Sequence, residues 1–198
     1  MLSRTVLIAA LAALLVVPVA AAASVHVRVE GKTQTLYGPA EPTLQGENAL
    51  QALDSASLAG ELYYHVTTTS FGPYVDQVGR YGGAASSGWV FKVNGVSPPV
   101  GADQVQLKDG DTVLWYYADF GPTGGPPTLA LKKASGNSCY TVVAQDDNGK
   151  TVAQAGVVLR IGSKRTVKVT GGKACIGPHP GVLVRAIAPG AVRSNALA

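Results

Sequence analysis

The N-terminal part of the chain shows a regular alternation of hydrophobic and polar residues. Residues 25–30 alternate strictly, with a valine at every second position. Side chains point to opposite faces along a β-strand, so this pattern predicts a strand that buries its valines. The polar residues between them, His26, Arg28 and Glu30, are then expected to face water. Residues 33–37 are predicted to form a second strand, and the proline-containing stretch 38–46 a loop.

A single helix is predicted between residues 48 and 60. Asn48 suits the N-cap position, and Gln51 stands where its side chain can reach back to the start of the helix. Apolar residues then recur at helical spacing, at positions 49, 50, 52, 53 and 56. Gly60 follows as a stop signal. No other stretch after residue 23 gives a convincing helix, so a lone helix is expected to cover one face of a sheet.

Residues 88–117 contain the strongest strand and turn signals of the chain. Asn94-Gly95 favours a type I′ hairpin turn, because both central residues of that turn need a positive φ. Asp109-Gly110-Asp111 is a second turn signal. Alternation places large side chains on one face of each of the two strands, namely Trp89, Phe91 and Val93 in the first and Val113, Trp115 and Tyr117 in the second. Both tryptophans of the chain lie here, so this stretch is expected to form the centre of the larger core.

The order of these motifs resembles a known family. The chain is similar to the transcobalamin C-terminal-like domain in the order Gly88-Trp89, an apolar strand, Val93-Asn94-Gly95, a polar loop, Asp109-Gly110-Asp111 and an aromatic strand. The resemblance covers roughly residues 25–120 and implies a β-grasp-type fold. Domains of this family occur in many bacterial secreted proteins of unknown function. They also occur in vitamin B12 carriers, where they cover one face of the corrinoid together with a large helical domain.

Short strands separated by Gly-rich breaks follow in the second part of the chain. Strands are predicted at residues 139–145, 156–161, 165–170, 174–176 and 182–188, with a turn at 146–149. A spacing of about ten residues fits a small β-sandwich. The ending, residues 181–195, resembles the last strand of prealbumin-like or carboxypeptidase-regulatory-like Ig-type modules.

The sequence therefore predicts a mainly β protein with two domains. The first, residues 24–120, is a β-grasp-like α+β domain. A Gly- and Pro-rich linker at residues 121–127 leads to the second, an Ig-like or prealbumin-like β-sandwich at residues 128–198.

The first 23 residues have the features of a secretory signal peptide. Arg4 precedes an apolar run of 12 residues, 6–17, and Ala21-Ala22-Ala23 supplies the small residues for cleavage after Ala23. The alternative is an uncleaved membrane anchor, which needs about 20 apolar residues. We expect a secreted protein that is not inserted in the membrane after cleavage.

The two cysteines, Cys139 and Cys175, are expected to form a structural disulfide, as extracytoplasmic compartments allow. They do not form a Cys-x-x-Cys motif, which excludes a thioredoxin-like site. A reactive thiol is the alternative, but no neighbouring residue in the sequence favours one. The bond would close a loop of roughly 37 residues and contribute about 4 kcal/mol in the chain-entropy description.

Charge is distributed unevenly along the chain. Residues 24–126 carry ten acidic and five basic side chains, a net charge of −5, whereas residues 127–198 carry ten basic and two acidic ones, a net charge of +8. Such asymmetry indicates two units with different surfaces. The basic half could attract polyanions such as wall polymers or anionic lipid head groups. Alternatively, the charges serve solubility and the attraction between the two halves.

Aromatic residues concentrate in the first domain, where 12 of the 13 lie between Tyr37 and Phe120. A flat or apolar small molecule is therefore expected to bind there. Aromatic and histidine side chains in loops or on the strand faces away from the core are candidates for an exposed ligand-binding patch: Tyr63, His65, Tyr74, Tyr81 and Tyr116. The transcobalamin resemblance makes cobalamin or a related corrinoid the specific ligand to consider.

The sequence contains neither a Gly-x-Ser-x-Gly nor a His-Glu-x-x-His motif, and we expect no enzymatic activity. The three histidines lie far apart, and the acidic turns at 109–111 and 146–148 lack the ligands of a calcium loop, so no metal site is predicted. The basic half lacks aromatic side chains that could stack on bases, which argues against nucleic-acid binding.

The leading functional hypothesis is a secreted, monomeric, non-enzymatic module that binds an extracellular ligand, glycan or protein through a sheet face or loop of its first domain. One alternative is a soluble carrier of a small ligand, with a corrinoid as the specific candidate. Another is a structural cell-surface protein. An aromatic-lined cleft would favour the carrier, a flat exposed patch would favour contact with a protein or glycan, and a uniformly polar surface would favour the structural role.

Overall fold

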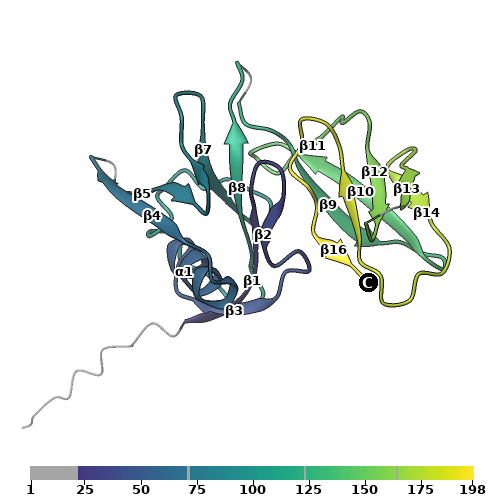
Figure 1. Cartoon of the computed structure of the whole chain (residues 1–198), viewed down its shortest axis with the longest axis horizontal. Coiled ribbons are helices and arrows are strands. Elements are labelled where there is room, and N and C mark those ends of the chain that lie inside the picture. The colour runs from purple at the N-terminus through teal and green to yellow at the C-terminus, as the bar shows by residue number, and fades with distance from the viewer. Residues whose placement is uncertain (1–21, 71, 123, 164) are drawn as a thin grey trace, which may run out of the picture.

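The computed structural model of the chain describes residues 22–70, 72–122, 124–163 and 165–198. Figure 1 shows two units side by side. The N-terminal unit contains β1 to β8 and the helix α1, and the C-terminal unit contains β9 to β16. The predicted signal peptide falls outside the described residues, apart from its last two. Ala23, after which cleavage is predicted, is the first residue of β1.

A five-stranded sheet forms the centre of the N-terminal unit. Its strands are β1 (Ala23–Glu30), β2 (Thr35–Tyr37), β3 (Thr43–Gly46), β7 (Ser87–Val93) and β8 (Thr112–Asp119). β1 and β8 run parallel at the centre, and β7 is antiparallel to β8 at one edge. Both β2 and β3 pair with β1 on its other side.

The predicted loop at residues 38–46 is wrong in its last part, which forms β3. Proline cannot donate a backbone hydrogen bond, and Pro39 and Pro42 both precede this strand. The four residues after Pro42 keep their N–H groups and pair with β1.

The predicted helix is confirmed as α1 (Ala49–Gly60). Asn48 caps it by accepting a hydrogen bond of 2.9 Å from the backbone N–H of Gln51. The Gln51 side chain reaches back, as expected, but it accepts from the N–H of Glu47, one residue before the cap. The helix ends at Glu61, which adopts a left-handed conformation with φ of 50°.

The core of the N-terminal unit lies between α1 and the central sheet. The β1 valines, Trp89, Val113 and Trp115 are buried there. Each indole finds a backbone acceptor, since Trp89 donates to the carbonyl of Tyr81 and Trp115 to that of Ala49. The predicted inward faces of the two aromatic strands are therefore confirmed.

A small antiparallel sheet lies beside the central one. It consists of β4 (Tyr64–Thr69), β5 (Gly72–Val78) and β6 (Tyr81–Gly82), and in the described residues none of these strands pairs with β7. At the far end of β7 the predicted type I′ turn is confirmed, with φ of 52° at Asn94 and 84° at Gly95.

Two four-stranded sheets form the C-terminal unit, as expected for a β-sandwich. In the first, β10 (Cys139–Gln145) pairs with β9 (Thr128–Lys133), β11 (Thr151–Val152) and β14 (Lys173–Cys175). In the second, the order is β13 (Arg165–Lys168), β12 (Val158–Ile161), β15 (Val184–Ile187) and β16 (Ala196–Leu197). A second core fills the space between them, including Leu129, Tyr140, Leu159 and Val184.

The predicted disulfide between Cys139 and Cys175 is present. The two residues are paired neighbours on β10 and β14, so the bond fastens adjacent strands of one sheet.

The two units meet on the face of the central sheet that is opposite to α1. Val90, Leu114, Tyr116 and Ala118 of this face pack with Val192 of the C-terminal unit. The predicted exposure of Arg28 and Glu30 on the same face is therefore wrong: they are only 4% and 1% exposed.

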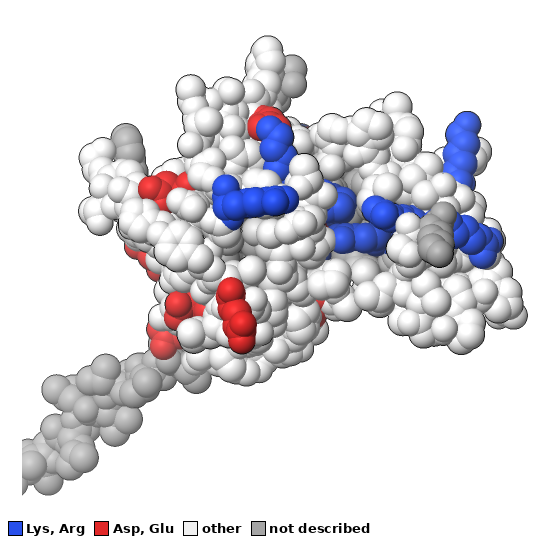
Figure 2. Space-filling model, viewed as in Figure 1, with Lys and Arg blue, Asp and Glu red and all other residues white. Residues whose placement is uncertain are grey.

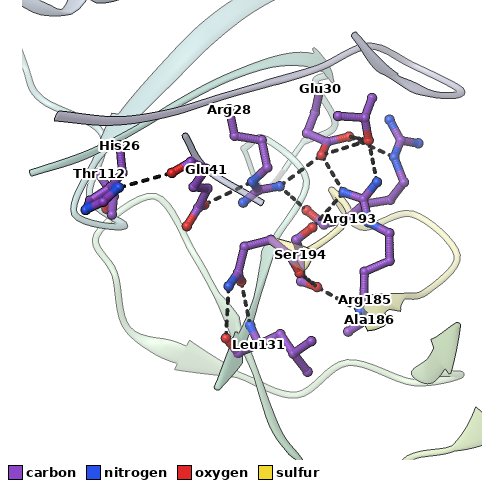
Figure 3. A network of polar contacts seen from close by, with 12 residues as sticks. His26, Arg28, Glu30, Glu41, Thr112, Leu131, Arg185, Ala186, Arg193 and Ser194 are labelled. Atoms are coloured by element: carbon purple, nitrogen blue, oxygen red, sulfur yellow. Dashed lines mark hydrogen bonds and ion pairs between the residues drawn. The ribbon is translucent and has the colours of Figure 1, made fainter. Parts of the chain in front are cut away.

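Glu30 is the centre of a charged network between the units (Figure 3). Its carboxylate accepts hydrogen bonds from Arg185 at 2.6 Å and Arg193 at 2.8 Å, both in the C-terminal unit. Arg28 donates to it at 3.1 Å and also to Glu41. These bonds compensate the cost of burying the charges.

The unequal charges of the two halves appear on the surface. In Figure 2 acidic side chains lie mainly over the N-terminal unit, whereas basic ones lie over part of the N-terminal unit, at the boundary and over the C-terminal unit. The contacts of Glu30 support the expectation that part of the basic excess attracts the two halves.

Candidate functional site: a pocket beside strand β7

A pocket of about 370 Å³ opens beside β7. Pockets of roughly 300 Å³ and more are large enough to bind a small molecule. Its walls come from β5, β7, β8, the loop 97–102 and two residues beyond these, and they are Pro73, Tyr74, Val75, Trp89, Val90, Phe91, Ser97, Pro98, Val100, Gly101, Ala102, Trp115, Tyr116, Phe120 and Asp147. Only Asp147 belongs to the C-terminal unit, and it is also the only charged residue of the lining.

Three large hydrophobic residues are exposed around this pocket. Tyr74 is 41%, Val100 is 46% and Phe120 is 43% exposed. Tyr74 lies on β5, Val100 in the loop after the Asn94-Gly95 turn, and Phe120 directly after β8. Apolar residues that gather at a concave surface mark binding sites more often than isolated ones do.

Tyr116 lies at the inner end of the pocket, where the two units meet. Its hydroxyl donates to Oδ1 of Asp147 at 3.3 Å. Burial raises the pKa of Tyr116, and the nearby charge of Asp147 raises it further. The prediction that Tyr116 belongs to an exposed patch is wrong, because it is 1% exposed beneath the C-terminal unit.

Lys92 fixes the turn that carries Asp147. Its ammonium group is fully buried and donates to the carbonyl of Asp146 at 2.6 Å and to Thr128 at 3.2 Å. Oδ1 of Asp147 lies 3.6 Å away. Burial lowers the pKa of Lys92, while the charge of Asp147 acts against this shift.

Ser97 makes a second connection to this turn. Its backbone N–H donates to the carbonyl of Asp147 at 2.8 Å, and its hydroxyl donates to the Asp147 carboxylate at 3.4 Å. The C-terminal unit thereby holds the start of the loop 97–102, which forms one wall of the pocket.

The structure brings together two of the residues predicted for ligand binding. Tyr74 and Tyr116 both line the pocket. Tyr63 is 59% exposed and His65 forms an exposed ion pair with Asp76 at 2.7 Å, and neither belongs to the lining. Tyr81 also lies outside the lining, and its hydrogen bonds with Thr33 and Arg80 lower its pKa.

Sequence reasoning missed part of the hydrophobic lining of the site. Val90, Val100 and Phe120 were not selected as site residues, because only the fold brings them together.

The chemistry of the lining suits binding. Its surface is mostly hydrophobic and aromatic, with a single carboxylate that already contacts Lys92, Ser97 and Tyr116. Among the described residues, no three His, Cys, Asp or Glu side chains come together in a group that could hold a metal ion. In the same part of the chain no helix has the length and apolar character of a membrane span.

The comparisons with known proteins match only part of the chain. No curated protein matches the chain. Residues 46–119, which run from the end of β3 through α1 to the end of β8 and contain most of the pocket lining, match the model of a family described as a domain of unknown function, DUF4430.

Proposed function

We propose that the protein is a secreted, non-enzymatic binding module whose ligand site is the pocket beside β7. The observation that carries this proposal is an apolar, aromatic-lined pocket with Tyr74, Val100 and Phe120 exposed at its surface. Exposed hydrophobic groups of this size stabilise a complex when a ligand removes them from water. The C-terminal unit supports the site by fixing Asp147 and the loop 97–102.

Secretion is supported by the N-terminal sequence and by the disulfide. Disulfides persist mainly outside the cytoplasm, and Cys139 and Cys175 form one. The partner we propose is accordingly an extracellular protein, glycan or small molecule, bound by a monomer.

A relation to the transcobalamin C-terminal-like domain is supported by three features. The central strands β1 and β8 are parallel, and one helix covers the sheet. The Asn94-Gly95 turn directly follows β7, the strand after which it was expected. A role as a corrinoid carrier is the second candidate. A corrinoid is larger than a pocket of about 370 Å³, so it would have to rest on the exposed residues at the surface rather than enter.

Titration of the purified protein with N-phenyl-1-naphthylamine, a neutral fluorescent apolar probe, tests the proposal. The neutral probe avoids attraction to the basic unit. We expect saturable binding that weakens by about tenfold in Val100→Glu, because a carboxylate disfavours an apolar ligand in the pocket. Val182→Glu is the matched control, since Val182 is 37% exposed in the C-terminal unit.

Equal effects of the two substitutions, or no saturable binding, would contradict the pocket as the ligand site. A parallel absorbance titration with cobalamin tests the second candidate. Saturable cobalamin binding that Val100→Glu weakens and Val182→Glu does not would favour the carrier role.

A further inference from the structure

The two carboxylate oxygens of Asp147, the charged residue of the pocket lining, have different surroundings. Oδ1 contacts the Tyr116 hydroxyl at 3.3 Å, the Ser97 hydroxyl at 3.4 Å and the Lys92 ammonium group at 3.6 Å. Within the described residues no donor reaches Oδ2, although the side chain is 42% exposed. The hydrogen bonds of this oxygen are therefore left to water or to a ligand.

Oδ2 lies beside the exposed ring of Phe120. A Cβ atom placed on Gly125 would lie 3.6 Å from Oδ2 of Asp147 and 3.5 Å from Cε1 of Phe120. The oxygen and the edge of the ring thus border the same small space. A group bound in this space contacts a carboxylate and an aromatic ring together.

Three aromatic rings of the pocket are partly accessible, namely those of Tyr74, Phe91 and Phe120. In the described part of the chain no cation lies over any of them. Lys92 lies over the ring of Tyr116, at 6.0 Å from its centroid, and the other such pairs are outside the pocket lining. The face of an aromatic ring attracts a cation through its quadrupole.

The surroundings of Asp147 favour a cation over an anion or a neutral group. Lys92 lies within 4 Å of its carboxylate but is fully buried, and Asp146 acts on the same ammonium group. An anionic ligand would be repelled by the unpaired oxygen. A neutral apolar group would remove that oxygen from water without replacing its hydrogen bonds, which is unfavourable. An ammonium group replaces them with a charge-assisted bond.

We propose that the pocket beside β7 binds a small hydrophobic amine in its protonated form. This inference rests on the proposed binding function and specifies its ligand. The ammonium group donates to Oδ2 of Asp147 and contacts the ring of Phe120. The hydrophobic part occupies the space between Tyr74, Phe91 and Val100. A volume of about 370 Å³ accommodates a molecule of one ring with short substituents.

The experiment compares three compounds of similar shape that differ in charge. They are 4-tert-butylbenzylamine, a cation at neutral pH, 4-tert-butylbenzyl alcohol, which is neutral, and 4-tert-butylbenzoate, an anion. Isothermal titration calorimetry of the whole protein measures each dissociation constant. We expect the amine to bind at least about tenfold more tightly than the alcohol, and the benzoate to bind most weakly.

The first variant removes the proposed charge partner. Asp147→Asn should abolish most of the preference for the amine over the alcohol. Asp119→Asn is the matched control, because it removes an exposed carboxylate next to Phe120 that pairs with Lys32. It should leave the preference unchanged.

A second variant keeps Asp147 and its bonds in place. Gly125→Ala adds a methyl group between Phe120 and Oδ2 and should weaken binding of the amine by at least about fivefold. Gly121→Ala is its control in the same linker, since a Cβ there meets nothing within 4 Å. Neither glycine has a positive φ, so alanine suits both positions.

Equal affinities for the amine and the alcohol, or tightest binding of the benzoate, would overturn the assignment to amines. So would a preference for the amine that persists in both Asp147→Asn and Gly125→Ala, because the cation would then bind elsewhere. If the naphthylamine probe still binds in a Val100-dependent manner, the pocket remains a ligand site and only its assignment to amines fails.

Discussion

At the scale of single residues, the carboxylate of Glu30 connects the two units. It lies between Arg185 and Arg193 of the C-terminal unit and Arg28 of its own strand, and its side chain is fully buried. A buried charge of this kind is favourable only while its partners remain in place, since each unpaired charge is costly to keep from water.

Glu30→Gln should lower the free energy of unfolding by about 3–5 kcal/mol, because it leaves buried arginines without their anion. Urea unfolding followed by Trp fluorescence measures this. Asp119→Asn is the control, since the Lys32–Asp119 pair is more than half exposed on both sides and should contribute less than about 1 kcal/mol. Similar losses in both variants would contradict a dominant role for Glu30.

The raised pKa of Tyr116 predicts how the stability of the protein changes at alkaline pH. Because its pKa is raised above the ordinary value of 10.0, the folded protein keeps this proton when the unfolded chain has lost it. Stability from Tyr116 is therefore complete below pH 10 and decreases as the pH rises above it, by up to about 1.4 kcal/mol per pH unit.

Tyr116→Phe should reduce stability at pH 8 by about 1 kcal/mol, through loss of the hydrogen bond to Asp147. The difference from the wild type should shrink between pH 10 and 11. Lys92 is present in both proteins, so its own opposite contribution does not enter the comparison. Urea titrations across this range measure the effect, with Tyr63→Phe as the exposed control. If the free energy of unfolding of the wild type and of Tyr116→Phe changed in parallel with pH, Tyr116 would not be the group responsible for the alkaline loss of stability.

At the scale of elements, local signals predicted much of the fold. Asn48 caps α1, Asn94 and Gly95 form the turn after β7, and the faces of β7 and β8 follow their alternation. Each of these depends on residues within a few positions of one another, and such signals are present in the sequence.

Asn48→Ala should destabilise the protein by about 1 kcal/mol, because the first turn of α1 loses its side-chain acceptor. Asn48→Asp should retain most of the stability, since aspartate is an equally good cap. Thermal unfolding followed by circular dichroism compares the two variants. A loss in Asn48→Asp as large as in Asn48→Ala would show that the cap is not the reason.

Replacement of Cys139 and Cys175 together by serine should destabilise the C-terminal unit by about 2–4 kcal/mol, because the unfolded chain gains conformational freedom. Differential scanning calorimetry measures the change in melting. Hydrogen exchange of β10 and β14 should increase more than that of β1 and β8. Equal increases in both units would contradict a local role of the disulfide.

At the scale of the whole molecule, the errors of sequence reasoning share one cause. Alternation along β1 and β8 shows which residues pack on α1, but not what covers the other face. Arg28, Glu30 and Tyr116 are buried by residues of the C-terminal unit, such as Arg185, which is 155 positions from Glu30. No local pattern contains that contact.

The candidate site was likewise predictable only in part, because some of its residues meet through contacts that no local pattern contains. Tyr74 and Tyr116 could be selected as aromatic residues outside the predicted core, and both line the pocket. Val100 and Phe120 could not, because the site exists only after β5, the loop 97–102 and β8 have come together.

The measurement that tests the central claim most directly is methyl NMR of the whole protein during titration with N-phenyl-1-naphthylamine. A ligand in the pocket should shift the methyl signals of Val75, Val90 and Val100 saturably, while those of Val182 and Leu183, exposed in the C-terminal unit, stay unchanged. Shifts of similar size in both units, or none at the three pocket valines, would contradict a binding site beside β7.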